Sequence, residues 1–96
     1  MEWLISVAPP DTAAAFYRTS AGAEIDLLLT LPGDRRWAIE ITRSLSPKVE
    51  KGFHTACEDL KPERKFVVYS GNENYPLSHQ VEATGVAALA GLIVRQ

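Results

Sequence analysis

The stretch from 23 to 43, "AEIDLLLTLPGDRRWAIEITR", decides the fold, because it holds two alternating segments joined by turn-forming residues. Apolar side chains occupy every second position of the first segment, at Ile25, Leu27, Leu29 and Leu31. The intervening face carries Glu24, Asp26, Leu28 and Thr30. After "PGDR" the alternation resumes, with Trp37, Ile39 and Ile41 opposite Ala38, Glu40 and Thr42. A period of two is typical of strands, so this stretch is predicted to form a hairpin.

The flanking segments indicate a helix and further strands around the hairpin. A strand is expected over Phe16 to Thr19, with its aromatic residues in the core. The segment "SLSPKVEKGFHTACEDLKP" predicts a helix with Ser46 as N-cap, Pro47 at the first helical position and Pro62 closing the segment. The chain therefore continues from strands into a helix.

The C-terminal half adds a strand and a helix. The apolar run "KFVVYSG" is typical of a strand covered on both faces, and "NENYPLSHQ" is expected to be a polar loop. A short strand at Val81 to Ala83 and a helix over "GVAALAGLIVRQ" complete the pattern, while residues 1–8 form a partial element that "PPD" ends. The predicted class is α/β, a mixed central sheet flanked by helices.

Composition restricts the chain to a single ordinary globular domain over residues 1–96, with 46% hydrophobic and 23% charged residues. No apolar run reaches the roughly 18 residues that span a bilayer, and no secretory signal is visible, so a cytoplasmic protein without membrane contact is expected. The lone Cys57 agrees with a reducing compartment and is predicted to be buried. A net charge of −2 provides no general attraction to nucleic acid.

Two carboxylates on the predicted hairpin suggest a metal site. Residues two apart in a strand share a face, so Glu40 and Thr42 project together, and Asp26 occupies the matching face of the preceding strand. Neighbouring carboxylates repel each other, and a divalent cation such as Mg²⁺ removes that conflict. The chemistry implied is phosphodiester hydrolysis by metal-bound water.

The motifs "EID" and "EIT" resemble the PD-(D/E)XK nuclease superfamily, which has the restriction-endonuclease-like fold. "FYRTSAGAEIDLLL" with "WAIEITRSLSPK" is similar, more closely, to the C-terminal domain of unknown function of prokaryotic AAA-type ATPases. The resemblance extends from about Phe16 to the final helix. It implies that the chain is the C-terminal part of a larger ATPase-related protein with a truncated N-terminus, although the chain has no phosphate-binding loop of its own.

The resemblance also assigns roles to individual residues. Asp26 and Glu40 match the metal-binding acidic pair, whereas Thr42 stands where the family has lysine. A missing electrostatic contact of this kind costs about 10²- to 10³-fold in rate. Lys48, near the start of the following helix, is a candidate substitute, and Glu2 is the acidic residue left in the segment where the family has a further glutamate.

The sequence thus predicts a nuclease-like accessory domain with a degenerate metal-dependent site that contacts nucleic acid or a partner protein, such as an ATPase domain. Two alternatives stay open. One is an active Mg²⁺-dependent nuclease that uses Asp26 and Glu40. The other is a dimerisation or protein-interaction module, for which a homodimer and an exposed apolar patch on the final helix or the N-terminal segment are expected.

Overall fold

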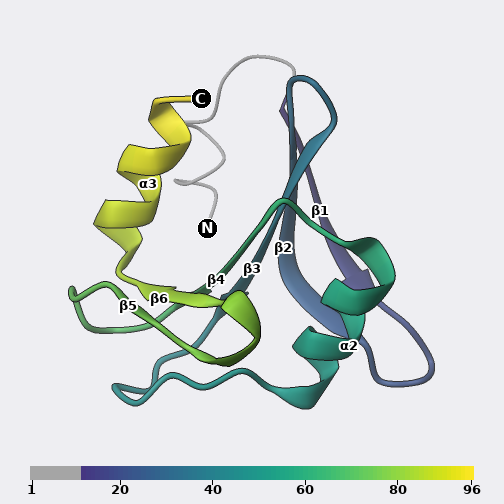
Figure 1. Ribbon diagram of the computed structural model, residues 1–96, viewed down its shortest axis with the longest axis horizontal. Helices are drawn as coiled ribbons and strands as arrows, with labels where there is room; N and C mark the ends of the chain where they lie inside the picture. Colours follow the sequence, from purple (N-terminus) through teal and green to yellow (C-terminus); the bar gives the residue numbers. More distant parts are fainter. Residues whose placement is uncertain (1–11) are drawn as a thin grey trace.

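The hairpin predicted from the alternating pattern forms two neighbouring antiparallel strands of a six-stranded mixed sheet (Figure 1). The computed structural model describes residues 12–96. The strands are β1 (Ala13–Arg18), β2 (Glu24–Leu31), β3 (Arg35–Ile41), β4 (Arg64–Val68), β5 (Tyr75–Pro76) and β6 (Glu82–Thr84). The helices are α2 (Lys51–Leu60) and α3 (Val86–Val94), with a short 3-10 turn, η1 (Ser78–Gln80), before β6.

The spatial order of the strands is β1-β2-β3-β4-β6-β5. The first three strands pair antiparallel, β3 to β4 and β4 to β6 pair parallel, and β5 returns antiparallel at the far edge. Parallel neighbours need a crossover connection, and α2 supplies it between β3 and β4. The predicted class, an α/β fold with a mixed central sheet and helices, is confirmed.

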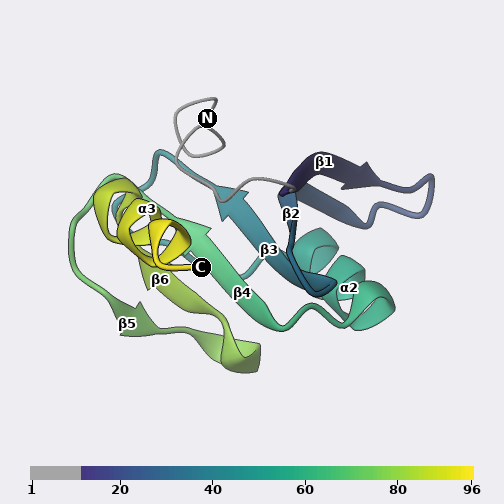
Figure 2. The same cartoon turned by 90° about the horizontal axis from the view of Figure 1, so that it is seen from above.

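Alternation along β3 divides the core into two layers, one on each face of the sheet. Trp37 and Ile39 lie in the layer that contains α3, whereas Ala38 lies in the layer that contains α2. Figure 2 shows α2 beside β2 and β3, and α3 near β4 and β6. The helices therefore cover opposite faces, as expected for strands whose two sides are both apolar.

The uniform alternation predicted for β2 is wrong at its first apolar position. Leu27 packs in the α3 layer, but Ile25 packs in the α2 layer with Phe53. The cause is a β-bulge, because β1 advances two residues between Ala15 and Tyr17 while β2 advances three. Two successive residues of β2 therefore stand opposite one residue of β1, and this reverses the phase of the strand.

The predicted helix start at Ser46 is also wrong, because α2 begins at Lys51 with Glu50 in the N-cap position. The backbone N–H of Ser46 donates to the hydroxyl of Ser44 at 3.0 Å. Local hydrogen bonds from serine and threonine compete with helix formation. Residues 42–50 consequently form an irregular segment, called here the 42–50 loop, that runs past the end of β3.

The remaining differences concern edges and exposure. The segment expected to be a loop contains β5 and η1, and β6 lies one residue later than predicted. Phe16, expected in the core, is 74% exposed on the edge strand β1, whereas Trp37 is buried. Of the apolar patch expected on the final helix, Val94 is 59% exposed. The partial element predicted over residues 1–8, with Glu2, lies outside the described residues.

Within residues 12–96, none of the helices is long and apolar enough to cross a membrane.

Candidate functional site

The two acidic residues singled out in the sequence lie on neighbouring strands at one end of the sheet. Leu27 of β2 pairs with Ile39 of β3 at the end of their ladder, and Asp26 and Glu40 are the next residues along the two strands. Oδ2 of Asp26 accepts a hydrogen bond of 2.9 Å from the backbone N–H of Ile41, the residue that follows Glu40. This contact holds the Asp26 carboxylate against β3 beside the Glu40 position.

The environment of Glu40 disfavours its negative charge. Partial burial and then the charge of Asp26 raise the pKa of Glu40 from an ordinary 4.5 to about 7. Glu50 and Glu24 act in the same direction, and a hydrogen bond from the backbone of Glu50 opposes them. The described charges that act on Glu40 are all carboxylates, so this position would gain from a cation.

A pocket of about 280 Å³ opens beside Glu40 at the carboxyl end of β3. Its other walls come from the end of that strand and from the 42–50 loop, with residues Ile41, Thr42, Ser44, Ser46, Pro47, Lys48 and Glu50. The structure thus brings together Glu40, Thr42 and Lys48. Asp26 does not line this pocket but reaches the backbone that forms it.

Lys48 stands at the rim of the pocket, where its Nζ lies 4.0 Å from Oε1 of Glu50. Its side chain is 78% exposed. Glu50 is the acidic residue that the sequence pattern missed, because the predicted helix placed it inside the first turn. The alternation rule could not reveal it, since an irregular loop carries the residue to the site.

The hydroxyl of Thr42 has a structural partner. Thr42 Oγ1 accepts a hydrogen bond of 3.2 Å from the backbone N–H of Ser44, and the N–H of Thr42 donates to the carbonyl of Val68 at 2.8 Å. The residue in the lysine position of the resembled family is therefore tied into the loop that follows β3.

The acidic residues suit a hard, oxygen-preferring cation better than a softer metal held by an all-protein cage. Residues 12–96 contain no group of three or more histidine, cysteine, aspartate or glutamate side chains arranged to hold a metal ion. Mg²⁺, however, is usually bound by one or two carboxylates, with water and phosphate oxygens completing its shell. The crowded pair of Asp26 and Glu40 fits that requirement.

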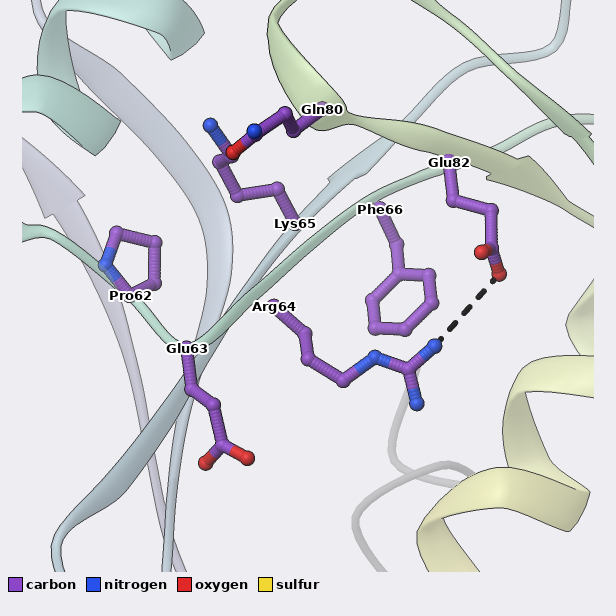
Figure 3. Close-up of a pocket in the computed structure, with 7 residues that line it drawn as sticks. All are labelled: Pro62, Glu63, Arg64, Lys65, Phe66, Gln80 and Glu82. Atoms are coloured by element: carbon purple, nitrogen blue, oxygen red, sulfur yellow. Dashed lines mark ion pairs between the residues drawn. The ribbon is translucent and has the colours of Figure 1, made fainter.

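A second pocket, of about 210 Å³, lies at the amino end of β4, the opposite end of the parallel strands (Figure 3). Arg64 lies there over the rings of Trp37 and Phe66, at 5.2 and 4.9 Å from their centroids. Its guanidinium is 3.8 Å from the carboxylate of Glu82. Lys65 and Glu63 also line this pocket, so positive and negative charges are balanced there.

Comparison with known proteins gives a family without a described activity. Residues 2–89 match the family described as "Domain of unknown function (DUF4143)". The chain is also 37% identical over 68 residues to two uncharacterized proteins, Mb2031c of Mycobacterium bovis and Rv2008c of Mycobacterium tuberculosis. Each match covers 71% of this chain and 15% of the relative's length. No solved structure matches. The chain belongs to the DUF4143 family.

Proposed function

We propose that this chain is a restriction-endonuclease-like accessory domain whose metal-dependent phosphodiesterase site is degenerate. The observation that carries the proposal is the Asp26 carboxylate held on the Ile41 amide beside Glu40, whose pKa is raised to about 7 by burial and then by the charge of Asp26. Strongly perturbed ionisable groups cluster at functional sites, where burial and like-charge neighbours shift their pKa values. The PD-(D/E)XK resemblance of "EID" and "EIT" supports the same reading.

In this proposal Asp26 and Glu40 hold Mg²⁺, and a phosphate of bound nucleic acid supplies further oxygen ligands. A bound Mg²⁺ would polarise a phosphoryl oxygen and a water molecule. Thr42 presents a neutral hydroxyl where a cationic group would stabilise the charge that develops during hydrolysis. The site therefore binds better than it cleaves. The domain then acts as a nucleic-acid contact beside an ATPase domain or another partner protein.

Calorimetric titration with Mg²⁺ and with Mn²⁺ tests the metal site. Wild type is expected to bind one ion with a dissociation constant that rises at least about tenfold in Asp26→Asn and in Glu40→Gln, because each change removes one charged ligand. Glu63→Gln, which neutralises an exposed carboxylate in the opposite pocket, serves as the matched control and is expected to bind like wild type. Equal binding by all four proteins would remove the proposed site.

The position of Lys48 favours a second candidate function, an active Mg²⁺-dependent nuclease. Lys48 shares the pocket with Glu40 and Thr42, and a lysine at the rim could contact the scissile phosphate. This reading expects nicking of supercoiled DNA that disappears in Asp26→Asn and in Lys48→Gln. An absence of nicking by wild type, at enzyme in excess over DNA, would leave the accessory role.

The edge strand β1 favours the third candidate, an interaction module. Among the described residues β1 pairs only with β2, and Phe16 is 74% exposed on it. An exposed edge strand that carries mostly apolar residues is a template for a strand from another chain, including a second copy. Sedimentation equilibrium tests the homodimer: association that is lost in Phe16→Lys supports it, and a monomer at high concentration opposes it.

A further inference from the structure

The 42–50 loop is ordered by hydrogen bonds that begin at Thr42, although it contains no helix or strand. Oγ1 of Thr42 accepts from the N–H of Ser44 at 3.2 Å, and Oγ of Ser44 accepts from the N–H of Ser46 at 3.0 Å. Two hydroxyls thus cap two backbone donors in succession. Each such bond contributes roughly a two- to tenfold preference for the closed loop conformation.

A second set of contacts fixes the same loop from the side of β4. The hydroxyl of Ser70, two residues beyond β4, donates toward the carbonyls of Arg43 and Ser44, at 3.1 and 3.4 Å. Pro47 is buried, and its ring fixes one backbone angle just before Lys48. The loop is therefore held at both of its sides up to the residue before Lys48.

We propose that Thr42 and Ser44 are positioning residues, whose hydroxyls hold the loop so that the ammonium of Lys48 contacts a phosphate of nucleic acid at the Glu40 pocket. This rests on the proposed function. Thr42 stands where the PD-(D/E)XK superfamily has a lysine. In this proposal its hydroxyl also orders the 42–50 loop, which presents the positive charge of Lys48. The ammonium of Lys48 lies 4.0 Å from Oε1 of Glu50, and the lysine side chain is 78% exposed.

Two variants of Thr42 distinguish the effect of losing the hydroxyl from the effect of changing the size of the side chain. Thr42→Val keeps the shape but removes the acceptor, whereas Thr42→Ser keeps the hydroxyl. Amide hydrogen exchange is expected to accelerate at Ser44 by roughly three- to tenfold in Thr42→Val, and to stay as in wild type in Thr42→Ser. Thr30→Val, a change on β2, is the matched control and should not alter exchange at Ser44.

The functional readout is the affinity for a fluorescent single-stranded oligothymidylate in Mg²⁺, measured at several salt concentrations. Lys48→Gln is expected to weaken binding about fivefold and to reduce the salt slope by about 1, because one phosphate contact is lost. Thr42→Val should weaken binding to the same extent. The double variant should show no further loss, since both changes remove one contact. Thr42→Ser should bind like wild type.

The outcomes distinguish the two levels of the proposal. A wild type that binds oligothymidylate, with a Thr42→Val variant that binds equally well, overturns the positioning role and leaves the proposed function standing. Additive losses in the double variant also overturn it, because they show independent contributions. A wild type that binds no oligothymidylate removes the proposed nucleic-acid contact and the phosphate role of Lys48 together. Unchanged exchange at Ser44 in Thr42→Val removes the hydroxyl-held loop itself.

Discussion

Asp26 and Glu40 are the next residues beyond the Leu27–Ile39 pair of the β2–β3 ladder, and burial together with the charge of Asp26 raises the pKa of Glu40 to about 7. Asp26 is anchored by the N–H of Ile41, so it cannot swing away from Glu40 without losing a hydrogen bond. The pair thus keeps two carboxylates together at a cost in electrostatic energy. That cost has consequences for stability as well as for metal binding.

The first prediction concerns stability against pH in the absence of divalent cations. Between pH 4.5 and about 7 the folded protein keeps a proton on Glu40 that the unfolded chain has lost, so this group makes the fold less stable as pH rises through that window. Glu40→Gln is therefore expected to be more stable than wild type at pH 8, by about 1–3 kcal/mol after allowance for partial solvent screening.

Urea denaturation of both proteins at pH 4 and pH 8, in a chelating buffer, measures this difference. At pH 4 the group is protonated in both states, so its contribution to the difference should vanish. Glu63→Gln, which removes an exposed carboxylate at the opposite end of the parallel strands, provides the comparison. A Glu40→Gln variant that is equally or less stable than wild type at pH 8 would contradict the unfavourable charge at this position.

The second prediction concerns the missing lysine. Thr42→Lys places a cation beside Glu40 and should increase Mn²⁺-dependent DNA nicking by about 10²- to 10³-fold over wild type. The gain should disappear when Asp26→Asn is added, because the proposed metal ligand is then lost. Thr55→Lys on α2 adds the same charge elsewhere and should produce no gain. A Thr42→Lys variant that binds metal without cleaving would show that more than this lysine is missing.

The third prediction concerns the close contact between Gly52 of α2 and Gly22 in the turn between β1 and β2. A Cβ added at Gly52 would lie 2.5 Å from the carbonyl oxygen of Gly22, so Gly52→Ala should destabilise the fold by about 1–3 kcal/mol. Gly91→Ala is the matched control within α3. Nothing lies within 4 Å of its added Cβ, and it should stabilise by about 0.5–1 kcal/mol.

Thermal unfolding followed by circular dichroism compares the two glycine variants with wild type. Opposite shifts of the midpoint are expected, each of roughly 4–8 °C per kcal/mol for a domain of this size. If Gly52→Ala unfolds at the wild-type temperature, the close approach of α2 to the turn is incorrect.

The fourth prediction concerns the thiol of Cys57. Burial chiefly, and the charge of Glu40 to a lesser extent, raise its pKa to about 11, against the opposing effect of Lys65. Since the thiolate is the reactive form, a disulfide reagent at pH 8 should modify the folded protein about two orders of magnitude more slowly than the unfolded chain. Cys57 is the single cysteine, so the absorbance change reports this residue alone. Equal rates would show that the α2 layer is open.

Sequence alternation was enough to predict β2, β3 and the hairpin between them, because a period of two is a property of the strand itself. The same rule placed Glu40 and Thr42 on one side of β3, and both residues line one pocket. It failed at Ile25, since a bulge depends on how β1 pairs with β2 and leaves no local pattern.

The start of α2 could not be predicted for a related reason. Ser46 followed by Pro47 is a strong helix-start signal, yet the Ser44 hydroxyl offers the backbone another partner. Tertiary contacts, including the burial of Pro47, decide between a helix that starts at Ser46 and the local hydrogen bond to Ser44. Glu50 lies at the pocket because residues 42–50 form a loop in place of the predicted helix. A pattern of residue spacing could not have identified it.

The β-bulge opposite Phe16 also restricts insertions and deletions within β2. Asp26 is the one residue between Ile25 and Leu27, and its removal would let these two side chains keep their opposite layers in a regular strand, but it would remove the carboxylate that accepts from the Ile41 amide. A one-residue insertion there would displace Asp26 from the Ile41 amide. Natural variation in this family should therefore place gaps in the β1–β2 and β2–β3 turns and spare this segment.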